Sequence, residues 1–197
     1  MKAEQRQITL KRRDMKATEQ LRNEHEGIKV MLNILEQICR QLETDGNLNK
    51  EHFDGILEFL KVFVDKCHHG KEEDLLFPAL IAAGVPKDGP IAVMLQEHQM
   101  GRNYIKAMSD TYNVYLGGDK PSYKAVGQNA FSYISLLRNH IDKENNVLFM
   151  MADSLLSDIK QDELFEGFEG IEKERIGVGK HEEFHGLLKN LSKIYLK

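Results

Sequence analysis

A repeated histidine–glutamate pattern constrains the fold of this chain more than any other feature. The stretch 67–78 reads CHHGKEEDLLFP, and within it His68 and Glu72 stand four residues apart. The stretch 140–149 has the same form: histidine, three residues, glutamate, three residues, Leu-Phe. Residues four apart share one face of an α-helix. Each copy therefore predicts a helix that presents an imidazole and a carboxylate side by side, able to hold one metal ion or to bridge two.

The repeat includes the preceding helices. Glu24-His25 recurs as Glu97-His98 after 73 residues, and the His-x3-Glu pattern recurs after 72. Two helical hairpins, each with one histidine on its first helix and His-x3-Glu on its second, would pack into a four-helix bundle with inward ligands. The candidate metal ligands are His25, His68, Glu72, His98, His140 and Glu144.

Apolar residues spaced by three and four predict an all-α fold, an antiparallel four-helix up-down bundle with extra C-terminal helices. In the first and third stripes a histidine takes the place of an apolar residue, at His25 and His98. We expect three regions: a charged N-terminal arm (1–17), the bundle (18–152) and a C-terminal helical extension that covers it (153–197). The bundle turns are expected at 44–49, 83–89 and 116–121, and the last two helices at about 158–175 and 180–196.

Composition excludes several classes of protein. The net charge of −4 gives no basic footprint for nucleic acid, and no apolar run is long enough for a membrane span. The charged first residues do not resemble a secretory signal, and two cysteines fit a reducing cytoplasm. No Ser-His-Asp pattern, P-loop or dinucleotide-binding fingerprint is present. We therefore expect a cytoplasmic protein without nucleic-acid or membrane partners.

Charge burial explains the type of site. Four imidazoles and two carboxylates inside an apolar bundle are costly unless they are paired or bound to cations. Nitrogen and oxygen ligands without thiolates suit iron, manganese or zinc, and they argue against iron–sulfur clusters and copper(I). Both glutamates are well placed to bridge a metal pair.

The sequences HHGKEEDLLFP and NHIDKENNVLF resemble those of the hemerythrin-like family, also described as HHE cation-binding domains, over about residues 18–152. The resemblance implies a non-haem di-iron centre, with two iron ions bridged by carboxylates. Members bind oxygen, sense oxygen or iron, handle nitric oxide or peroxide, or repair damaged iron centres. The second stretch is most similar to the iron-centre repair branch.

The chain departs from respiratory hemerythrin at two positions. Arg102 stands where that protein has a further histidine, and Glu144 where it has an aspartate. We therefore expect the centre to react with oxygen, nitric oxide or peroxide and not to carry oxygen reversibly. A non-catalytic oxygen or iron sensor, an iron-handling module and a structural zinc bundle remain open.

Three further histidines could complete the metal site. His69 is a weaker candidate than His68, because it projects about 100° away from its neighbour around an α-helix. His181 and His185 share one face of the last helix and could bind metal, although a cover helix with two rim histidines is the favoured reading. Glu73 and Asp74 are expected to face solvent, His52 to lie on the surface and Cys67 to be a small core residue.

Overall fold

The computed structural model describes residues 16–177 and 179–196, and these residues contain helices and no strand. Most of the expected charged arm, residues 1–15, lies outside the described part. Four long helical segments form the body of the molecule. They are α2 (Ala17–Asp45); α3 (Lys50–Phe59) with η1 (Leu60–His69), η2 (Glu72–Leu76) and α4 (Phe77–Ala82); α5 (Pro90–Leu116); and α6 (Tyr123–Lys143) with η4 (Glu144–Leu148) and α7 (Phe149–Leu155).

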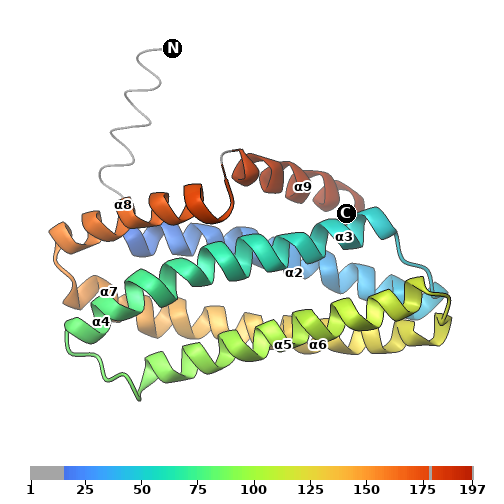
Figure 1. Cartoon of the computed structure of the whole chain (residues 1–197), viewed down its shortest axis with the longest axis horizontal. Coiled ribbons are helices and arrows are strands. Elements are labelled where there is room, and N and C mark those ends of the chain that lie inside the picture. The colour runs from blue at the N-terminus through green and yellow to red at the C-terminus, as the bar shows by residue number, and fades with distance from the viewer. Residues whose placement is uncertain (1–15, 178, 197) are drawn as a thin grey trace, which may run out of the picture.

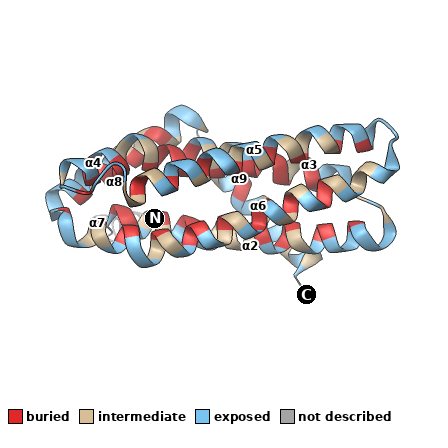
Figure 2. Cartoon of the chain, turned by 90° about the horizontal axis from the view of Figure 1, so that it is seen from below, coloured by how far each residue is buried: buried red, intermediate tan, exposed pale blue. Residues whose placement is uncertain are grey.

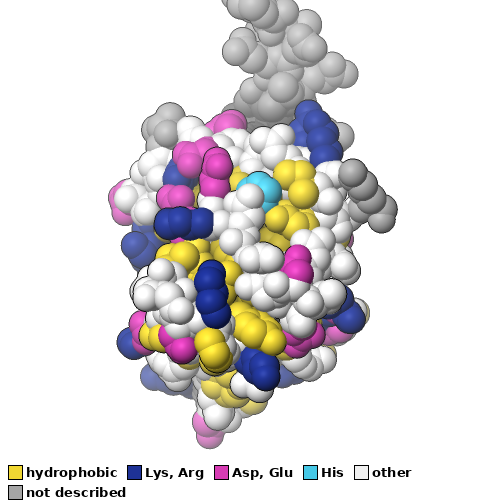
Figure 3. Space-filling model, turned by 90° about the vertical axis from the view of Figure 1, so that its right-hand side faces the viewer, with side chains coloured by type: hydrophobic (Ala, Val, Ile, Leu, Met, Phe, Trp, Pro, Cys, Tyr) yellow, Lys and Arg dark blue, Asp and Glu magenta, His cyan; other side chains and the backbone are white. Residues whose placement is uncertain are grey.

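The four segments lie side by side along the long axis of the molecule (Figure 1). The connections 46–49 and 117–122 lie at one end, and the second of them contains the short 3-10 helix η3 (Lys120–Ser122). The connection 83–89 lies at the other end. The surface of the first end carries hydrophobic side chains interspersed with charged side chains of both signs (Figure 3).

Local sequence signals explain where the segments begin and end. The Asn49 side chain accepts a hydrogen bond from the backbone N–H of His52 and so caps α3. At the end of α2, Gly46 adopts φ 70°, the left-handed conformation that glycine reaches at little cost. Buried residues follow one stripe along each segment, as Figure 2 shows.

The core consists of two apolar clusters with a polar layer between them. One cluster contains Ile28, Val64, Ile105 and Leu137, and the other contains residues such as Leu21. Along the first three segments, the candidate ligands of the bundle fall between the residues of one cluster and those of the other; along the fourth, His140 lies just before Ile141 of the first cluster, and Glu144 lies between Ile141 and Leu148 of the second. Buried apolar side chains thus enclose the candidate ligands from both sides.

Four of the candidate ligands lie on interruptions of the α-helical pattern: His68 and His69 on η1, Glu72 on η2 and Glu144 on η4. Segments η1, η2 and η4 are π-helical, with hydrogen bonds that span one residue more than in an α-helix. The apolar spacing of three and four in the sequence gives no sign of these π-helical turns. Such turns change the angle between successive side chains, and they occur often at functional sites.

The C-terminal residues form α8 (Asp158–Arg175) and α9 (Lys180–Tyr195). Ser157 caps α8 by accepting from the backbone N–H of Lys160. Helix α8 packs on α2, η1 and η2, and α9 packs on α2 and α3, so both lie on one side of the other segments (Figure 1). None of the described helices combines the length and apolar character that a membrane span requires.

Candidate metal centre

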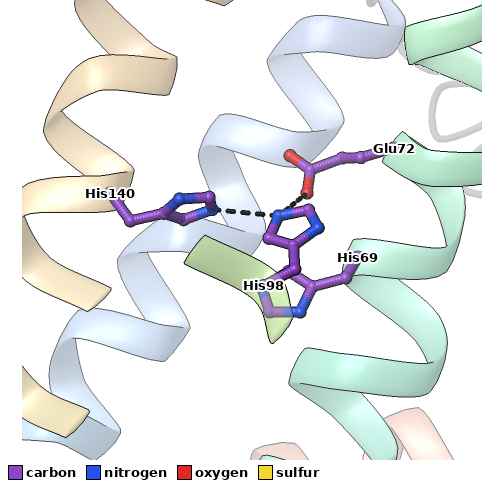
Figure 4. A group of neighbouring side chains, drawn as sticks. All are labelled: His69, Glu72, His98 and His140. Carbon is purple, nitrogen blue, oxygen red and sulfur yellow. Dashed lines mark hydrogen bonds and ion pairs between the residues drawn. The ribbon is translucent and has the colours of Figure 1, made fainter. Parts of the chain in front are cut away.

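Two groups of buried side chains in the polar layer could each hold a metal ion. Within each group, one ligand atom per residue lies within 4.8 Å of all the others. The groups are His69, Glu72, His98 and His140, and His25, His68, Glu72 and Glu144. Figure 4 shows the first group, whose side chains converge from three helical segments. Glu72 belongs to both groups, which is the position a bridging carboxylate requires.

The inner nitrogens of the histidines face one another in pairs. Nε2 of His25 lies 2.9 Å from Nε2 of His68, and Nε2 of His98 lies 3.1 Å from Nε2 of His140. Glu144 spans the two pairs, with one oxygen 3.2 Å from His25 Nε2 and the other 3.1 Å from His140 Nε2. Two nitrogen lone pairs at such distances repel unless a proton or a cation lies between them.

Each of these four histidines is held from outside through Nδ1. His68 Nδ1 lies 2.8 Å from a Glu24 oxygen, and His140 Nδ1 lies 2.9 Å from a Glu97 oxygen. His98 donates to Glu73 (2.7 Å) and His25 to Asn145 (2.9 Å) in the same way. A carboxylate only accepts hydrogen bonds, so Nδ1 carries the proton and Nε2 is left free for a metal ion.

The supporting residues follow the repeat as closely as the ligands do. The residue before His25 holds His68, and the residue before His98 holds His140. The residues after Glu72 and Glu144 hold the remaining two histidines. The sequence pattern of the ligands does not by itself point to these supporting residues. The repeat does, because each supporting residue in one half has a counterpart 72 or 73 residues away in the other half.

Lysines support the two repeated glutamates, but in different surroundings. Lys71 is fully buried and lies 2.5 Å from both Glu24 and Glu172 of α8. Its counterpart Lys143 contacts Glu97, and its side chain is 42% exposed. Of these two lysines, Lys71 contacts a residue of the C-terminal extension. Through it, α8 is linked to the outer hydrogen bonds of one half of the centre.

Electrostatics follow from burial and pairing. Burial alone would raise the pKa of Glu24, but Lys71 and His68 outweigh it and lower the pKa to about 2. Burial lowers the pKa of His68 to about 4 and that of His69 well below its usual value. Both rings therefore favour the neutral form, which is the form of imidazole that binds metal ions.

The two central glutamates behave as a coupled pair. Burial and the charge of Glu144 raise the pKa of Glu72 well above its usual value. Burial opposes ionisation of Glu144 too, but His140, His25 and His98 outweigh it and lower its pKa. Burial would lower the pKa of His140, yet Glu144 and Glu97 raise it to about 9. Without metal, protons hold the charge balance that metal ions would otherwise supply.

The donor set fits metal ions. Both carboxylate oxygens of Glu72 and of Glu144, and both ring nitrogens of His69, are buried without a hydrogen-bond partner among the described residues. Buried polar atoms are almost always hydrogen-bonded, so six such atoms in one layer form a donor set that bound cations would satisfy. Imidazole and carboxylate ligands suit iron, manganese or zinc.

Comparison with known proteins agrees with this geometry. A family model described as the hemerythrin HHE cation binding domain matches residues 16–152. The chain belongs to the hemerythrin HHE cation-binding family. Uncharacterised proteins of Mycobacterium bovis and of two strains of Mycobacterium tuberculosis are each 26% identical over 161 residues, which is 82% of this chain. The chain spans 63% of the length of these curated relatives. No solved structure matches it.

His69 lies closer to the hemerythrin-like centre than an α-helical projection predicts. Its ring is 3% exposed and stacks on His98, with centroids 3.9 Å apart. The π-helical η1 ends at His69, and its wider turn places both His68 and His69 inside. Two of the less certain candidates, His181 and His185, belong to neither group; their rings pack against each other 4.7 Å apart on α9.

The structure of this hemerythrin-like domain also tests the predictions for residues beside the ligands. The prediction that Glu73 faces solvent is wrong, because its carboxylate holds both His98 and Arg102. Asp74 is exposed, as expected. Cys67 is buried in the core as predicted, and burial raises the pKa of its thiol to about 12. His52 is half-buried, and its Nδ1 lies 2.6 Å from the Tyr195 hydroxyl.

Proposed function

We propose that this chain is a non-haem di-iron protein, built as an antiparallel up-down four-helix bundle, that reacts with small oxidants in the cytoplasm. Bound iron would supply electrons to oxygen, nitric oxide or peroxide. Oxidative or nitrosative stress response, or repair of iron centres, is the setting we infer. The observation that carries this proposal is the pair of buried four-residue groups that share Glu72.

The residues have distinct roles in this proposal. His69, His98 and His140 would hold one ion, and His25 and His68 the other, with Glu72 and Glu144 between them. The outer partners orient the rings and fix the proton on Nδ1. A neutral imidazole is then always turned with its free nitrogen inward.

The repeated Leu-Phe sequences would exclude water. Phe149 stacks on the His25 ring with centroids 5.3 Å apart, and Phe77 stacks on His98 at 5.8 Å. Both phenylalanines are almost fully buried. They separate the histidines from solvent on the side of the apolar cluster that contains Leu21. An apolar barrier of this kind favours access by small uncharged molecules.

Metal analysis with an optical spectrum tests the proposal most directly. We expect about two iron ions per chain and near-ultraviolet absorption in the oxidised form, whereas a zinc bundle is colourless. Stopped-flow spectra of the reduced protein mixed with oxygen should show net oxidation. Recovery of the reduced protein after oxygen is removed under argon would instead identify a reversible carrier.

Loss of a bridging carboxylate should remove metal. We expect Glu144→Ala to lose bound iron, because it deletes the residue that contacts both histidine pairs. His52→Ala is the control, since His52 belongs to neither group. The measurement is the iron-to-protein ratio after gel filtration. A Glu144→Ala protein that keeps its full iron content would disprove the bridging role.

A sensor is the second candidate function, and one observation favours it. Glu172 of α8 reaches Lys71, which holds Glu24, which holds His68. A change of metal state could alter how α8 packs through this chain of contacts. Equal hydrogen exchange of α8 in the metal-free, reduced and oxidised forms would exclude this function.

A further inference from the structure

Four ionisable side chains near His98 are replaced by other residue types around His25, its counterpart in the repeat. The offset of 72 or 73 residues pairs each of them with a residue of different chemistry. The pairs, beginning with the residue near His98, are Asp65 and Leu137, His69 and Ile141, Glu73 and Asn145, and Arg102 and Lys29. These four differences give one side of the metal centre a polar network of its own.

Arg102 on α5 joins the two carboxylates of this network. Its Nε donates to Asp65 Oδ1 at 2.7 Å, and one of its terminal nitrogens donates to Glu73 Oε1 at 2.6 Å. A guanidinium presents its N–H groups in a rigid, planar fork. Arg102 therefore fixes the positions of two carboxylates at once.

The same carboxylate oxygens face two histidine rings. Glu73 Oε1 accepts from His98 Nδ1 at 2.7 Å, and Asp65 Oδ1 lies 3.6 Å from His69 Nδ1. Burial would raise the pKa of Glu73, but His98 and Arg102 outweigh it and lower the pKa, so Glu73 is an anion that accepts from both. His69 and His98 belong to one metal-binding group, which Figure 4 shows.

His69 differs from the other four histidines of the two groups in its outer contact. Each of those four uses Nδ1 for an outer partner and leaves Nε2 for metal. Neither ring nitrogen of His69 has a hydrogen-bond partner among the described residues. Asp65 lies four residues earlier on η1, and its distance from Nδ1 is slightly longer than a hydrogen bond. Asp65 thus occupies the place of the missing outer partner.

We propose that Arg102 is a positioning residue, which holds two of the carboxylates that orient the metal ligands. Through Glu73 it fixes the ring of His98, and through Asp65 it fixes the ring of His69. Each carboxylate keeps the proton on Nδ1, so that Nε2 of both rings faces the same metal ion. This role rests on the proposed metal centre. Arg102 acts from outside the ligand set, since a guanidinium has no acceptor atom for a metal ion.

NMR of the zinc-loaded protein tests this role, because zinc(II) has no redox chemistry and accepts the same ligands. In the full-length protein with isotopically labelled histidine, we expect Nδ1–H signals of His69 and His98 that exchange slowly with water. Arg102→Met should make both signals exchange about tenfold faster, because the carboxylates that accept from them are no longer held. The signals of the other three ligand rings should keep their positions and exchange rates.

Zinc affinity gives a second readout. Competition with a chelator at equilibrium should show that Arg102→Met binds one of its two zinc ions about tenfold more weakly. Asp65→Leu, which introduces the residue type found at position 137, should weaken the same ion about tenfold and disturb the Nδ1–H signal of His69 alone. Both variants should fold, because Arg102 and Asp65 are partly exposed and such ion pairs contribute little stability.

Lys29→Met is the matched control, because Lys29 follows His25 by four residues, as Arg102 follows His98. Lys29 pairs with the exposed Glu26 on its own helix. This variant should leave all the ring signals and both zinc dissociation constants unaltered.

The proposal is overturned if Arg102→Met leaves the ring signals and the zinc affinity unaltered, if it weakens both zinc ions alike, or if Lys29→Met has the same effect. A protein that binds no zinc contradicts this role and the proposed metal centre together. If the zinc-loaded protein responds as expected but fails the iron and oxygen tests, the role of Arg102 is supported and the oxidant chemistry alone is rejected.

Discussion

At the scale of single residues, the two halves of the metal centre differ most in how their lysines are placed. Lys71 has no solvent exposure and bonds two carboxylates, whereas Lys143 is partly exposed and bonds one. A buried charge that loses its partner is strongly destabilising, because the remaining charge cannot be solvated. Exposed pairs contribute little, because water screens them.

We therefore expect Lys71→Met to lower the free energy of unfolding by about 3 kcal/mol. Glu24 and Glu172 would be left facing each other without the cation. Lys143→Met, the matched change in the second repeat, should cost less than about 1 kcal/mol. Urea unfolding followed by circular dichroism measures both. Equal losses for the two variants would contradict the asymmetry.

The sequence makes His69 a weaker candidate ligand than His68, whereas the structure buries it in one of the two metal-binding groups. We expect His69→Ala to reduce bound iron from about two ions to about one, because the group of His25, His68, Glu72 and Glu144 stays intact. His181→Ala should retain both ions. Iron analysis of the three proteins decides this, and full iron content in His69→Ala would remove His69 from the ligand set.

At the scale of elements, α8 is the helix that connects the C-terminal extension to the centre. Two glycines three residues apart report how closely it packs. A Cβ at Gly167 would lie 2.8 Å from Leu75 Cδ1, whereas one at Gly170 would have no neighbour within 4 Å. Both positions are helical, so alanine gains the same helix propensity at each.

The two alanine variants should therefore differ in sign or size. Gly170→Ala should raise the free energy of unfolding by about 0.5–1 kcal/mol, since it restricts the unfolded chain without a clash. Gly167→Ala should give less or be destabilising, because Leu75 must move. Thermal unfolding of both variants is the measurement. An equal gain at both positions would show that α8 does not pack on η2 as described.

The sequence predicts the elements well where periodicity governs and less well where tertiary contacts do. The stripe with Leu21, His25 and Ile28 is buried throughout, and the helix expected at about 158–175 is α8, which begins at Asp158. The π-helical turns were not predicted, because their widened hydrogen bonds do not alter the apolar spacing enough to be read. For that reason an α-helical projection ranks His69 below His68 as a ligand and turns Glu73 toward solvent, whereas the structure places His69 in a metal-binding group and Glu73 against His98.

At the scale of the whole molecule, the protein places a polar layer between two apolar clusters. Repetition predicts that layer from the sequence, since six ligands recur in register. The contact of Glu172 with Lys71 is not predictable in this way, because α8 has no counterpart in the repeat and its packing depends on surface shape. The layer itself is costly without metal, since the oxygens of Glu72 and Glu144 lack hydrogen-bond partners among the described residues.

That cost leads to a crossover in stability. Without metal, the free energy of unfolding of Glu72→Leu should exceed that of the unaltered protein by about 1–3 kcal/mol. The reason is that the change replaces an unsatisfied buried carboxyl with an apolar side chain.

With iron(II) under anaerobic conditions, the free energy of unfolding of the unaltered protein should rise by about 3 kcal/mol at a hundredfold excess of iron over the dissociation constant. Glu72→Leu should gain much less, since both metal groups lose a ligand. Glu166→Leu, an exposed change on α8, should leave both the metal-free stability and the gain unaltered. Unfolding curves of the three proteins, each with chelator and with iron(II), give the six values. If Glu72→Leu is the less stable protein in chelator, the metal-free layer is already satisfied and the site is not held open for a cation.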